Sequence, residues 1–543
     1  MLPCVRAGGA RRGAAPVRGR RRIVHRLARS DNARLARRGR ASSSTSVSLV
    51  SRRFGALSSL LLFAAAAAAP AHAQNAGLAA PTAHARVGFE RIRLPGSEHV
   101  GLLGTSYLVD VPSVEGLALG PAVYGGITGH RGGFFTLGGE VAWRRHIAGP
   151  VGVEVGLYAG GGGGAGAPVG GGLMFRPHVD LLWDLGPAAL GLSLSRVRFP
   201  SGRIDSTQVG IVLDAINDFR YVPAARLGSP VRGGGRSGLG FDRVQIVASA
   251  YRTRHGLALD DGTAAPRTIG MLGLRAEQAF DANAYWGVEA NGTTQRSVAG
   301  YAEYLGVLGY ETEAVSRTLN VGARIALGMG GGGGLPTGGG LLAKATVYGI
   351  VRISNELGVA LEAGLVDAPK GRLRAAHAGA ALVWSLDGPD NAGLPARPAR
   401  TDFSAGLLRY RAPRRDGSVS ALEADVLRVD RYLGAHLYLS GEVHSALRGG
   451  AGGYTAALVG LGWSQPLGSS LAVGAEVLGG ASGGGGVDSR GSLVRPMGWL
   501  AWQLSPAVAL RVGAGRVKSP HGPLSSTAVD AALVFTYGVA AGS

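Results

Sequence analysis

Charged side chains at matched positions of three internal repeats are the residues of this chain most able to do chemistry. In the last repeat, Glu476 and Arg511 lie two predicted strands apart on the same face. In the middle repeat, Arg324 and Glu362 take these positions with the signs exchanged, and the first repeat keeps Glu154. Because an unpaired charge is costly in a low-dielectric interior, the exchange predicts ion pairs across an enclosed space.

The first repeat has Ser193 where the others carry the second charge, and Arg176 lies on the strand between. Two roles fit this set of residues: a gate or selectivity ring for a passing solute, and a structural network that fills an interior. The structural role is favoured, because interior charges of barrels commonly belong to satisfied networks. The predicted interior network comprises Glu154, Arg176, Arg324, Glu362, Glu476, Arg495 and Arg511.

A loose Ser/His/Asp set in the first repeat raises the question of catalysis. His178 and Asp180 share a predicted inward face, and Ser193 and Ser195 lie on the next strand. The other two repeats do not keep these residues, and such trios arise by chance without hydrogen-bond geometry. The sequence therefore predicts no enzyme and no catalytic residue.

Cofactor and metal motifs are equally weak. The glycine runs satisfy G-x-G-x-x-G, but no G-K-[ST] or helix signal follows them, so phosphate binding is not expected. The segment Asp260-Asp261-Gly262 lacks the spaced oxygen ligands of a calcium site. No HExxH or similar histidine spacing follows residue 73. We expect no cofactor and no metal.

Short alternating strands must position the charged residues. Apolar and polar residues alternate with a period of two, in segments of about ten residues with tight polar joins, and this pattern predicts an antiparallel transmembrane β-barrel. In the last segment Val529, Leu533 and Phe535 fall on one face and Asp530 on the other. The clearest segments are 454–463, 471–480, 493–504, 508–518 and 527–537.

Repetition with eight strands per unit gives about 24 strands in all. Each unit contains a glycine-aromatic pair, a later glycine run and a P-x-G-x-[IL] turn. The pairs are Gly133-Phe134, Gly300-Tyr301 and Gly453-Tyr454, and the runs are 160–164, 330–334 and 483–486. The glycine runs are interpreted as flexible or tight external loops. Joins after even strands are shorter than joins after odd strands, which predicts inner turns and outer loops.

The N-terminal region reads as an export signal. Residues 1–73 hold 15 arginines and one acid, so the formal charge of +21 falls to +7 beyond them (41 Lys and Arg against 34 Asp and Glu) and nucleic-acid binding loses its support. An apolar stretch and the A-x-A motif predict signal-peptide cleavage between Ala73 and Gln74. The single cysteine, Cys4, precedes that site and excludes a disulfide framework in the exported chain.

These boundaries divide the chain as follows: 1–73 an Arg-rich leader with signal peptide, 74–86 a short periplasmic N-terminus, 87–219 the first β repeat, 220–240 a linker, 241–386 the second repeat, 387–400 a linker and 401–539 the third repeat. Either all strands close one large barrel, or each repeat closes as a tandem eight-stranded barrel. We expect the single large barrel, since tandem barrels are an arrangement without an obvious precedent. A soluble β array is disfavoured by the apolar outward faces.

The signal peptide, the alternating strands and the aromatic-containing final strand together resemble Gram-negative outer-membrane β-barrel proteins over residues 87–539. This resemblance implies the bacterial outer membrane as location, and lipid, lipopolysaccharide and the barrel-assembly machinery as partners. The final strand departs from the family pattern, because Phe535 and Tyr537 are followed by GVAAGS rather than ending the chain.

Three functions remain open. A pore or channel for small or polymeric solutes is favoured. The alternative is a surface adhesion or structural barrel whose outer loops bind anionic polysaccharide or lipid, through residues such as Arg131, Arg252, Arg254, Arg414, Arg415 and Arg448. A lipid-modifying hydrolase is a distant third.

Overall fold

The computed structural model describes residues 78–232, 235–316, 318–354, 356–386 and 395–542. The expected leader, the signal peptide, the cleavage site between Ala73 and Gln74, and residues 387–394 of the second expected linker lie outside these ranges. Within the described residues, no helix combines the length and apolar character needed to cross a membrane.

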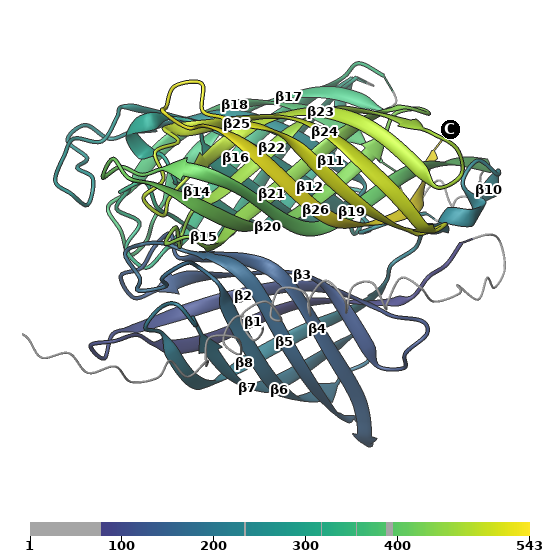
Figure 1. Cartoon of the computed structure of the whole chain (residues 1–543), viewed down its shortest axis with the longest axis horizontal. Coiled ribbons are helices and arrows are strands. Elements are labelled where there is room, and N and C mark those ends of the chain that lie inside the picture. The colour runs from purple at the N-terminus through teal and green to yellow at the C-terminus, as the bar shows by residue number, and fades with distance from the viewer. Residues whose placement is uncertain (1–77, 233–234, 317, 355, 387–394, 543) are drawn as a thin grey trace, which may run out of the picture. The chain divides into compact units, whose positions relative to one another are not determined.

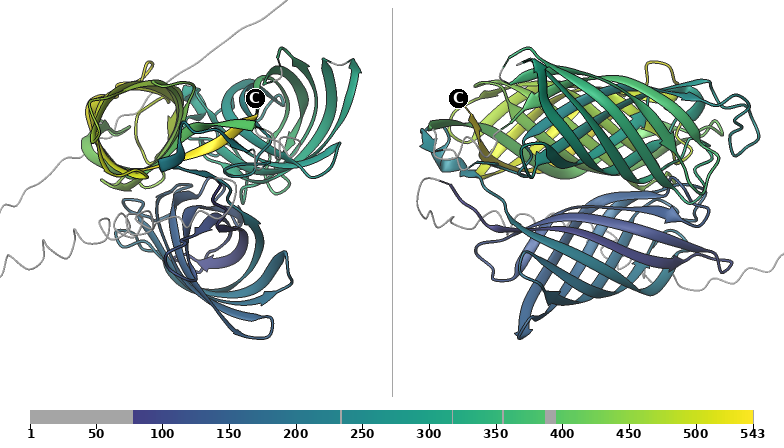
Figure 2. Two further views of the ribbon diagram at one scale, coloured as in Figure 1. Left: turned by 90° about the vertical axis from the view of Figure 1, so that its right-hand side faces the viewer. Right: turned by 180° about the vertical axis from the view of Figure 1, so that it is seen from behind.

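The strands close into three separate antiparallel barrels of eight strands each (Figure 1). The third barrel along the chain, called barrel 3 below, is seen end-on in the left view of Figure 2 and forms a closed ring of strands. Each barrel closes because its last strand pairs back with its own first strand and not with the next repeat. The predicted all-β, antiparallel barrel fold is confirmed, but the expected single large barrel is wrong, and the tandem alternative describes the chain.

The strand bounds follow the three repeats. Barrel 1 contains β1 (Thr82–Arg93), β2 (His99–Asp110), β3 (Leu117–Thr128), β4 (Phe135–Ala148), β5 (Val151–Gly163), β6 (Met174–Asp184), β7 (Ala188–Arg198) and β8 (Asp205–Asp218). Barrel 2 contains β11 (Arg243–Thr253), β12 (Thr268–Ala279), β13 (Ala284–Thr293), β14 (Ala302–Ser316), β15 (Leu319–Gly331), β16 (Leu341–Arg352), β17 (Leu357–Asp367) and β18 (Arg374–Ser385). Barrel 3 contains β19 (Pro395–Pro413), β20 (Val419–Tyr432), β21 (Leu437–Arg448), β22 (Thr455–Pro466), β23 (Leu471–Gly483), β24 (Gly491–Ser505), β25 (Val508–Lys518) and β26 (Ser525–Gly542).

Three boundaries differ from the sequence expectation. β1 begins at Thr82, within the segment expected as a short periplasmic N-terminus, and β19 begins at Pro395, within the second expected linker. The first expected linker contains two short strands, β9 (Val222–Pro223) and β10 (Val231–Arg232), with the 3-10 helix η1 (Ala224–Arg226) between them. β9 pairs with β26 and β10 pairs with β19, so this linker is hydrogen-bonded to barrel 3.

The period-two pattern produces opposite faces with opposite chemistry. In β7, Leu190, Leu192 and Leu194 are more than half exposed on the outside, while Ser193 and Ser195 are buried inside. Because neighbouring side chains of a strand point to opposite faces, one alternation supplies both an apolar outer surface and a polar interior. An outer surface of this kind is stable in hydrocarbon.

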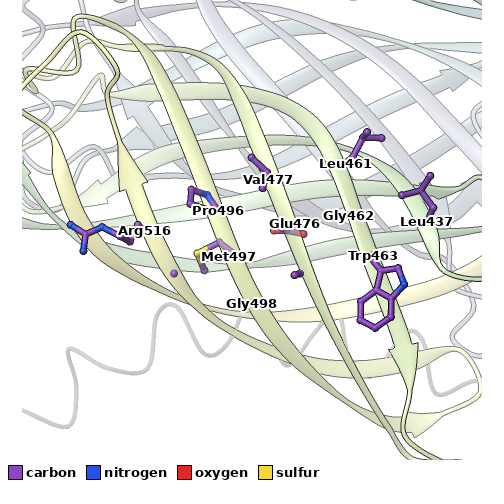
Figure 3. Close-up of a pocket in the computed structure, with 12 residues that line it drawn as sticks. Leu437, Leu461, Gly462, Trp463, Glu476, Val477, Pro496, Met497, Gly498 and Arg516 are labelled. Atoms are coloured by element: carbon purple, nitrogen blue, oxygen red, sulfur yellow. The ribbon is translucent and has the colours of Figure 1, made fainter.

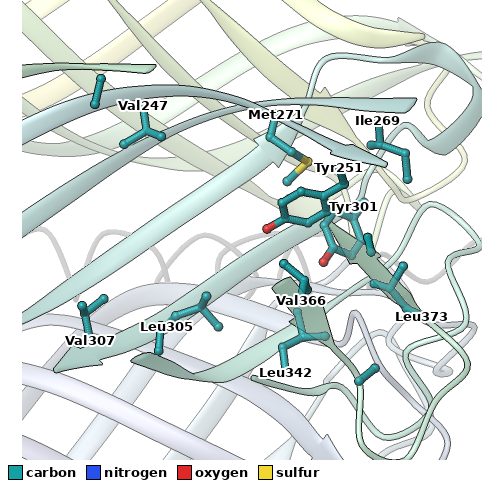
Figure 4. Packing of buried hydrophobic residues seen from close by; sticks show 14 of the residues in the cluster. Val247, Tyr251, Ile269, Met271, Tyr301, Leu305, Val307, Leu342, Val366 and Leu373 are labelled. Carbon is teal, nitrogen blue, oxygen red and sulfur yellow. The ribbon is translucent and has the colours of Figure 1, made fainter. Parts of the chain in front are cut away.

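Each interior also has an apolar end. In barrel 2 this cluster includes Tyr251, Ile269, Met271, Tyr301 and Leu342, all nearly or fully buried (Figure 4). These residues lie near the strand ends that join the longer loops. The apolar cluster and the charged middle together fill the barrel, as expected for eight strands, whose interior has room only for side chains.

The repeated glycines join the barrels. In each barrel, the loop between the third and fourth strands contacts the glycine run between the fifth and sixth strands of another barrel. Barrel 1 contacts the run of barrel 2 in this way, barrel 2 contacts the run of barrel 3, and barrel 3 contacts the run of barrel 1. The same kind of contact therefore joins each barrel to the next and the last back to the first, as in a closed ring of head-to-tail contacts. The contacts are Gly133 with Gly331 and Gly332, Gly300 with Gly483 and Gly484, and Gly453 with Gly163 and Gly164.

Backbone hydrogen bonds accompany two of these contacts. The Gly132 N–H donates to the Gly338 carbonyl at 2.9 Å, and the Gly453 N–H donates to the Gly162 carbonyl at 2.8 Å. A Cβ added at Gly453 would lie 2.7 Å from the Gly164 Cα, closer than real side chains approach. Only glycine allows the two backbones to come this near, so the interpretation of the runs as merely external loops was incomplete.

Asp425 adds a polar contact between barrels 1 and 3. It lies on β20 at an outward position, where neighbouring side chains are apolar, and its two carboxylate oxygens accept hydrogen bonds from Gly161 N and Ser445 N, both at 3.1 Å. Gly161 belongs to barrel 1 and Ser445 to barrel 3. A carboxylate on a membrane-facing surface is costly unless it is hydrogen-bonded, so this residue marks a contact between barrels.

Replacing Asp425 with leucine is expected to lower stability by about 1–3 kcal/mol, because the Gly161 N–H then loses its acceptor in an apolar setting. Asp425→Asn keeps one acceptor oxygen and should lose less. Urea unfolding of the refolded protein, monitored by heat-modifiable migration on a gel, measures the loss of stability in both variants. Equal midpoints for the two variants would contradict the assigned contact.

Candidate functional site

The interior of barrel 3 holds a dense set of ion pairs. Glu476 forms ion pairs with Arg511 at 2.7 Å and with Arg495 at 3.2 Å. Arg428 reaches Glu442 at 2.7 Å and Asp530 at 3.2 Å. Arg495 also contacts both Glu442 and Asp530. Since all of these side chains are buried, their charges are balanced by one another rather than by water.

In barrel 2 the pair between the fifth and seventh strands has its signs exchanged. Arg324, from β15, contacts Glu362, from β17. Glu362 also accepts from Arg275 at 3.0 Å, and Arg275 reaches Glu289 at 2.5 Å. Lys344 donates to the same Glu289 at 2.6 Å. Two carboxylates thus share three cations in the middle of the barrel.

In barrel 1 the predicted residues do not pair with one another. Glu154 contacts Arg86 and Arg144. Arg176 instead forms a two-pronged pair with Glu90, both N–O distances being 3.0 Å, and donates to Ser193 at 3.2 Å. The serine at the variable position therefore takes part in the network as a neutral acceptor.

The seven predicted charged residues are all buried, and the structure brings most of them together. Glu476 meets both Arg495 and Arg511, and Arg324 meets Glu362, whereas Glu154 and Arg176 belong to separate pairs. The sequence interpretation missed most partners. They are Arg86, Glu90, Glu140, Arg144 and Asp214 in barrel 1, Arg275, Glu277, Glu289 and Lys344 in barrel 2, and Arg428, Asp430, Glu442 and Asp530 in barrel 3; Asp180 was placed inward but not assigned to an ion pair. Their inward position in the alternation was a signal that could have found them.

The serine, histidine and aspartate set does not form a nucleophile-base pair. Ser195 Oγ donates to Glu90 at 2.5 Å and accepts from Gln208 at 2.7 Å. Ser193 Oγ accepts from Arg176. His178 Nε2 faces carboxylates, with Asp180 at 3.7 Å. Neither hydroxyl donates to His178, so the serine–histidine contact of a catalytic triad is not formed by these residues.

Glu154, His178 and Asp180 offer three possible metal-ligand atoms within 4.8 Å of one another. The Arg86 guanidinium, however, contacts both carboxylates. It supplies positive charge at the place where a bound cation would need to lie, so these residues form an ion-pair centre. Asp261, in an outer loop, has its pKa lowered by hydrogen bonds that the Thr263 hydroxyl and backbone N–H donate to its Oδ1 within the same turn.

Several arginines of the outer loops have structural partners. Arg131 forms a two-pronged pair with Glu98, which lowers the pKa of that carboxyl, and also binds the Ala165 carbonyl. Arg414 donates to the carbonyls of Gly485 and Gly449. These side chains hold loops together rather than extend into solvent.

The outer face of barrel 3 has a hollow of about 560 Å³ (Figure 3). Ala475 and Gly498 form part of its lining, and Trp463, Pro496 and Arg516 lie around them. It lies on the outward, apolar side of the strands, so it belongs to the surface that faces hydrocarbon and not to the charged interior.

Closed antiparallel barrels with apolar outer faces and charged interiors define a class, the transmembrane β-barrels. No protein-family model matches the chain, and no curated protein matches its sequence. The fold thus rests on strand alternation and barrel closure.

Solved structures with some similarity are receptors and channels. A mutant ferric enterobactin receptor (PfeA) from Pseudomonas aeruginosa is 9% identical, with 84% of this chain and 80% of that chain covered and a TM-score of 0.26. OpdQ from the same species is 8% identical, with 85% and 98% covered and a TM-score of 0.20. The outer membrane channel DcaP of Acinetobacter baumannii is 9% identical, with 86% and 100% covered and a TM-score of 0.19. Likeness at these TM-scores carries no argument about architecture or function.

Proposed function

We propose that this chain is an exported outer-membrane protein that acts as a closed, membrane-embedded scaffold. The observation that carries the proposal is the ion pairing inside each barrel. Arg86, Arg275 and Arg428 are at most 5% exposed, and each contacts at least two carboxylates. Eight strands leave an interior just wide enough for side chains, so a wide solute path has no support.

The outer-membrane location is supported by two independent features. The N-terminal sequence pattern predicts an export signal, and the barrel strands alternate apolar residues outward with polar residues inward. Binding of anionic polysaccharide or lipid by the outer loops would depend on cations that remain exposed, such as Arg252, Arg254 and Arg415.

A narrow pore is the second candidate. The observation that favours it is the lining of each interior by charged groups rather than by apolar side chains alone. Exchange of ion-pair partners could shift these groups while leaving the strand ladders in place. In that case the pairs Glu476–Arg511 and Arg324–Glu362 would act as gates.

Planar-bilayer recording of the refolded chain 74–543 separates the two candidates. A scaffold is expected to give no large single-step conductance, because buried ion pairs fill the interiors. The matched variant exchanges one pair, with Glu476→Arg and Arg511→Glu together. A large stepwise current in the wild type would overturn the scaffold, and unchanged current and stability in the exchanged variant would remove the gate.

A further inference from the structure

The outward faces of strands from all three barrels line a partly open cavity of about 1090 Å³. Its lining is mainly apolar and belongs to the surface that faces hydrocarbon elsewhere on the barrels. Single-ligand pockets commonly measure roughly 300–1,000 Å³, so this cavity is large enough for a long flexible molecule. Side chains that represent the three barrels are Phe135, Leu274, Tyr304, Phe403, Val443 and Ala457.

The two ends of the cavity differ. At the end with the longer loops, the glycine contacts bring Gly133, Gly300 and Gly453 against the glycine runs, and these residues belong to the lining. At the end with the shorter turns, the lining consists of turn residues and of η1, including the exposed Arg226. The cavity thus has a tightly packed glycine end and a turn end that carries a cation.

Aromatic rings lie at the turn end. Tyr537 packs against Phe219 and Tyr221, with ring centroids 5.6 Å and 6.2 Å away, and all three residues line the cavity. Aromatic rings are enriched where hydrocarbon meets lipid headgroups. Aromatic rings and a cation in the same cavity lining are the chemistry that places a headgroup at this end and an apolar chain behind it.

We propose that the acyl chains of a glycerophospholipid occupy this cavity, with the phosphate near Arg226. The inference rests on the membrane location proposed above. Apolar walls exclude water as a stable filling, and the tightly packed glycine end excludes entry from the side of the longer loops. The turn end lies on the side expected to face the periplasm, so the occupant comes from that leaflet.

The test is native mass spectrometry of the full chain, extracted from expressing Gram-negative cells and washed extensively in detergent. The wild type should retain about one or two phospholipids. Ala290→Trp and Ala457→Trp place indole rings into the cavity from barrels 2 and 3 and should lower retention at least several-fold. Ala345→Trp is the matched control, because Ala345 is outward and exposed on barrel 2 but does not line the cavity.

Insertion into liposomes and heat-modifiable migration are measured for each variant. A chain that inserts but retains no phospholipid, or retains detergent alone, overturns the lipid site and leaves the membrane location intact. Equal retention in all three tryptophan variants also overturns it. A chain that fails to insert contradicts the proposed function instead. Arg226→Gln should weaken retention of phospholipid while leaving insertion unchanged.

Discussion

Replacing Arg428 with leucine is expected to destabilise barrel 3 by about 3–5 kcal/mol, the usual cost of removing one partner from a buried ion pair. The Arg428 guanidinium is 2% exposed and holds Glu442 and Asp530. Without it, Arg495 is the arginine that still contacts both carboxylates in the middle of the barrel. Urea unfolding of refolded protein, scored by heat-modifiable migration, measures the loss.

Arg516→Leu is the matched control for that substitution. Arg516 lies on β25 of the same barrel, but it points outward and is exposed. Its charge is solvated or lipid-bridging, so its loss should change the unfolding free energy by less than about 1 kcal/mol. A similar midpoint shift for both variants would show that the interior network is not what stabilises the barrel.

Replacing Gly453 with alanine is expected to separate barrel 1 from barrel 3 while each barrel stays folded. The new methyl group would meet the Gly164 Cα and N, both at 2.7 Å. Because two backbones meet there, neither can yield as a flexible side chain would, and overpacking of this kind costs about 1–3 kcal/mol. Spin-label distances between Val209→Cys in barrel 1 and Val477→Cys in barrel 3, in the refolded chain 74–543, which has no other cysteine, report the separation.

Gly450→Ala is the matched control for Gly453→Ala, because it adds the same methyl group in the same loop without the contact between barrels. Gly450 lies in the same loop and has φ of +71°, against +93° for Gly453, but nothing lies within 4 Å of its added Cβ. Both alanines carry the strain of a left-handed backbone, about 1–2 kcal/mol, and only Gly453→Ala adds a clash. Broadening of the distance distribution in both variants would attribute the effect to loop strain and not to contact between barrels.

Strand number and facing could be predicted from the sequence, because period-two alternation is a local property. The glycine-aromatic pairs and glycine runs also divided the chain correctly into three units. Barrel closure could not be predicted in the same way. The edge of β8 offers the same backbone donors and acceptors whether it pairs with β1 or with β11, and no side-chain pattern distinguishes the two outcomes.

The interior network was only partly predictable for a related reason. Comparison of repeats highlights positions where charges change sign, such as Arg324 and Glu476. This comparison does not single out Arg86 or Glu90, because both lie on β1, one of the early strands that are least alike among the repeats. Asp425 was missed because the sequence does not show that the backbone of another barrel lies against this outward position. Without that contact, an acid on an apolar outer face has no evident role.

Because β9 and β10 pair with barrel 3, the glycine contacts between barrels can be weak and still hold the barrels together. The segment between barrels 1 and 2 is fixed at two points, so the barrels meet as tethered partners rather than by diffusion. Short tethers give effective concentrations in the millimolar range. Contacts too weak to assemble three independent chains would therefore suffice here, and severing the tether should cost assembly far more than it costs any single barrel.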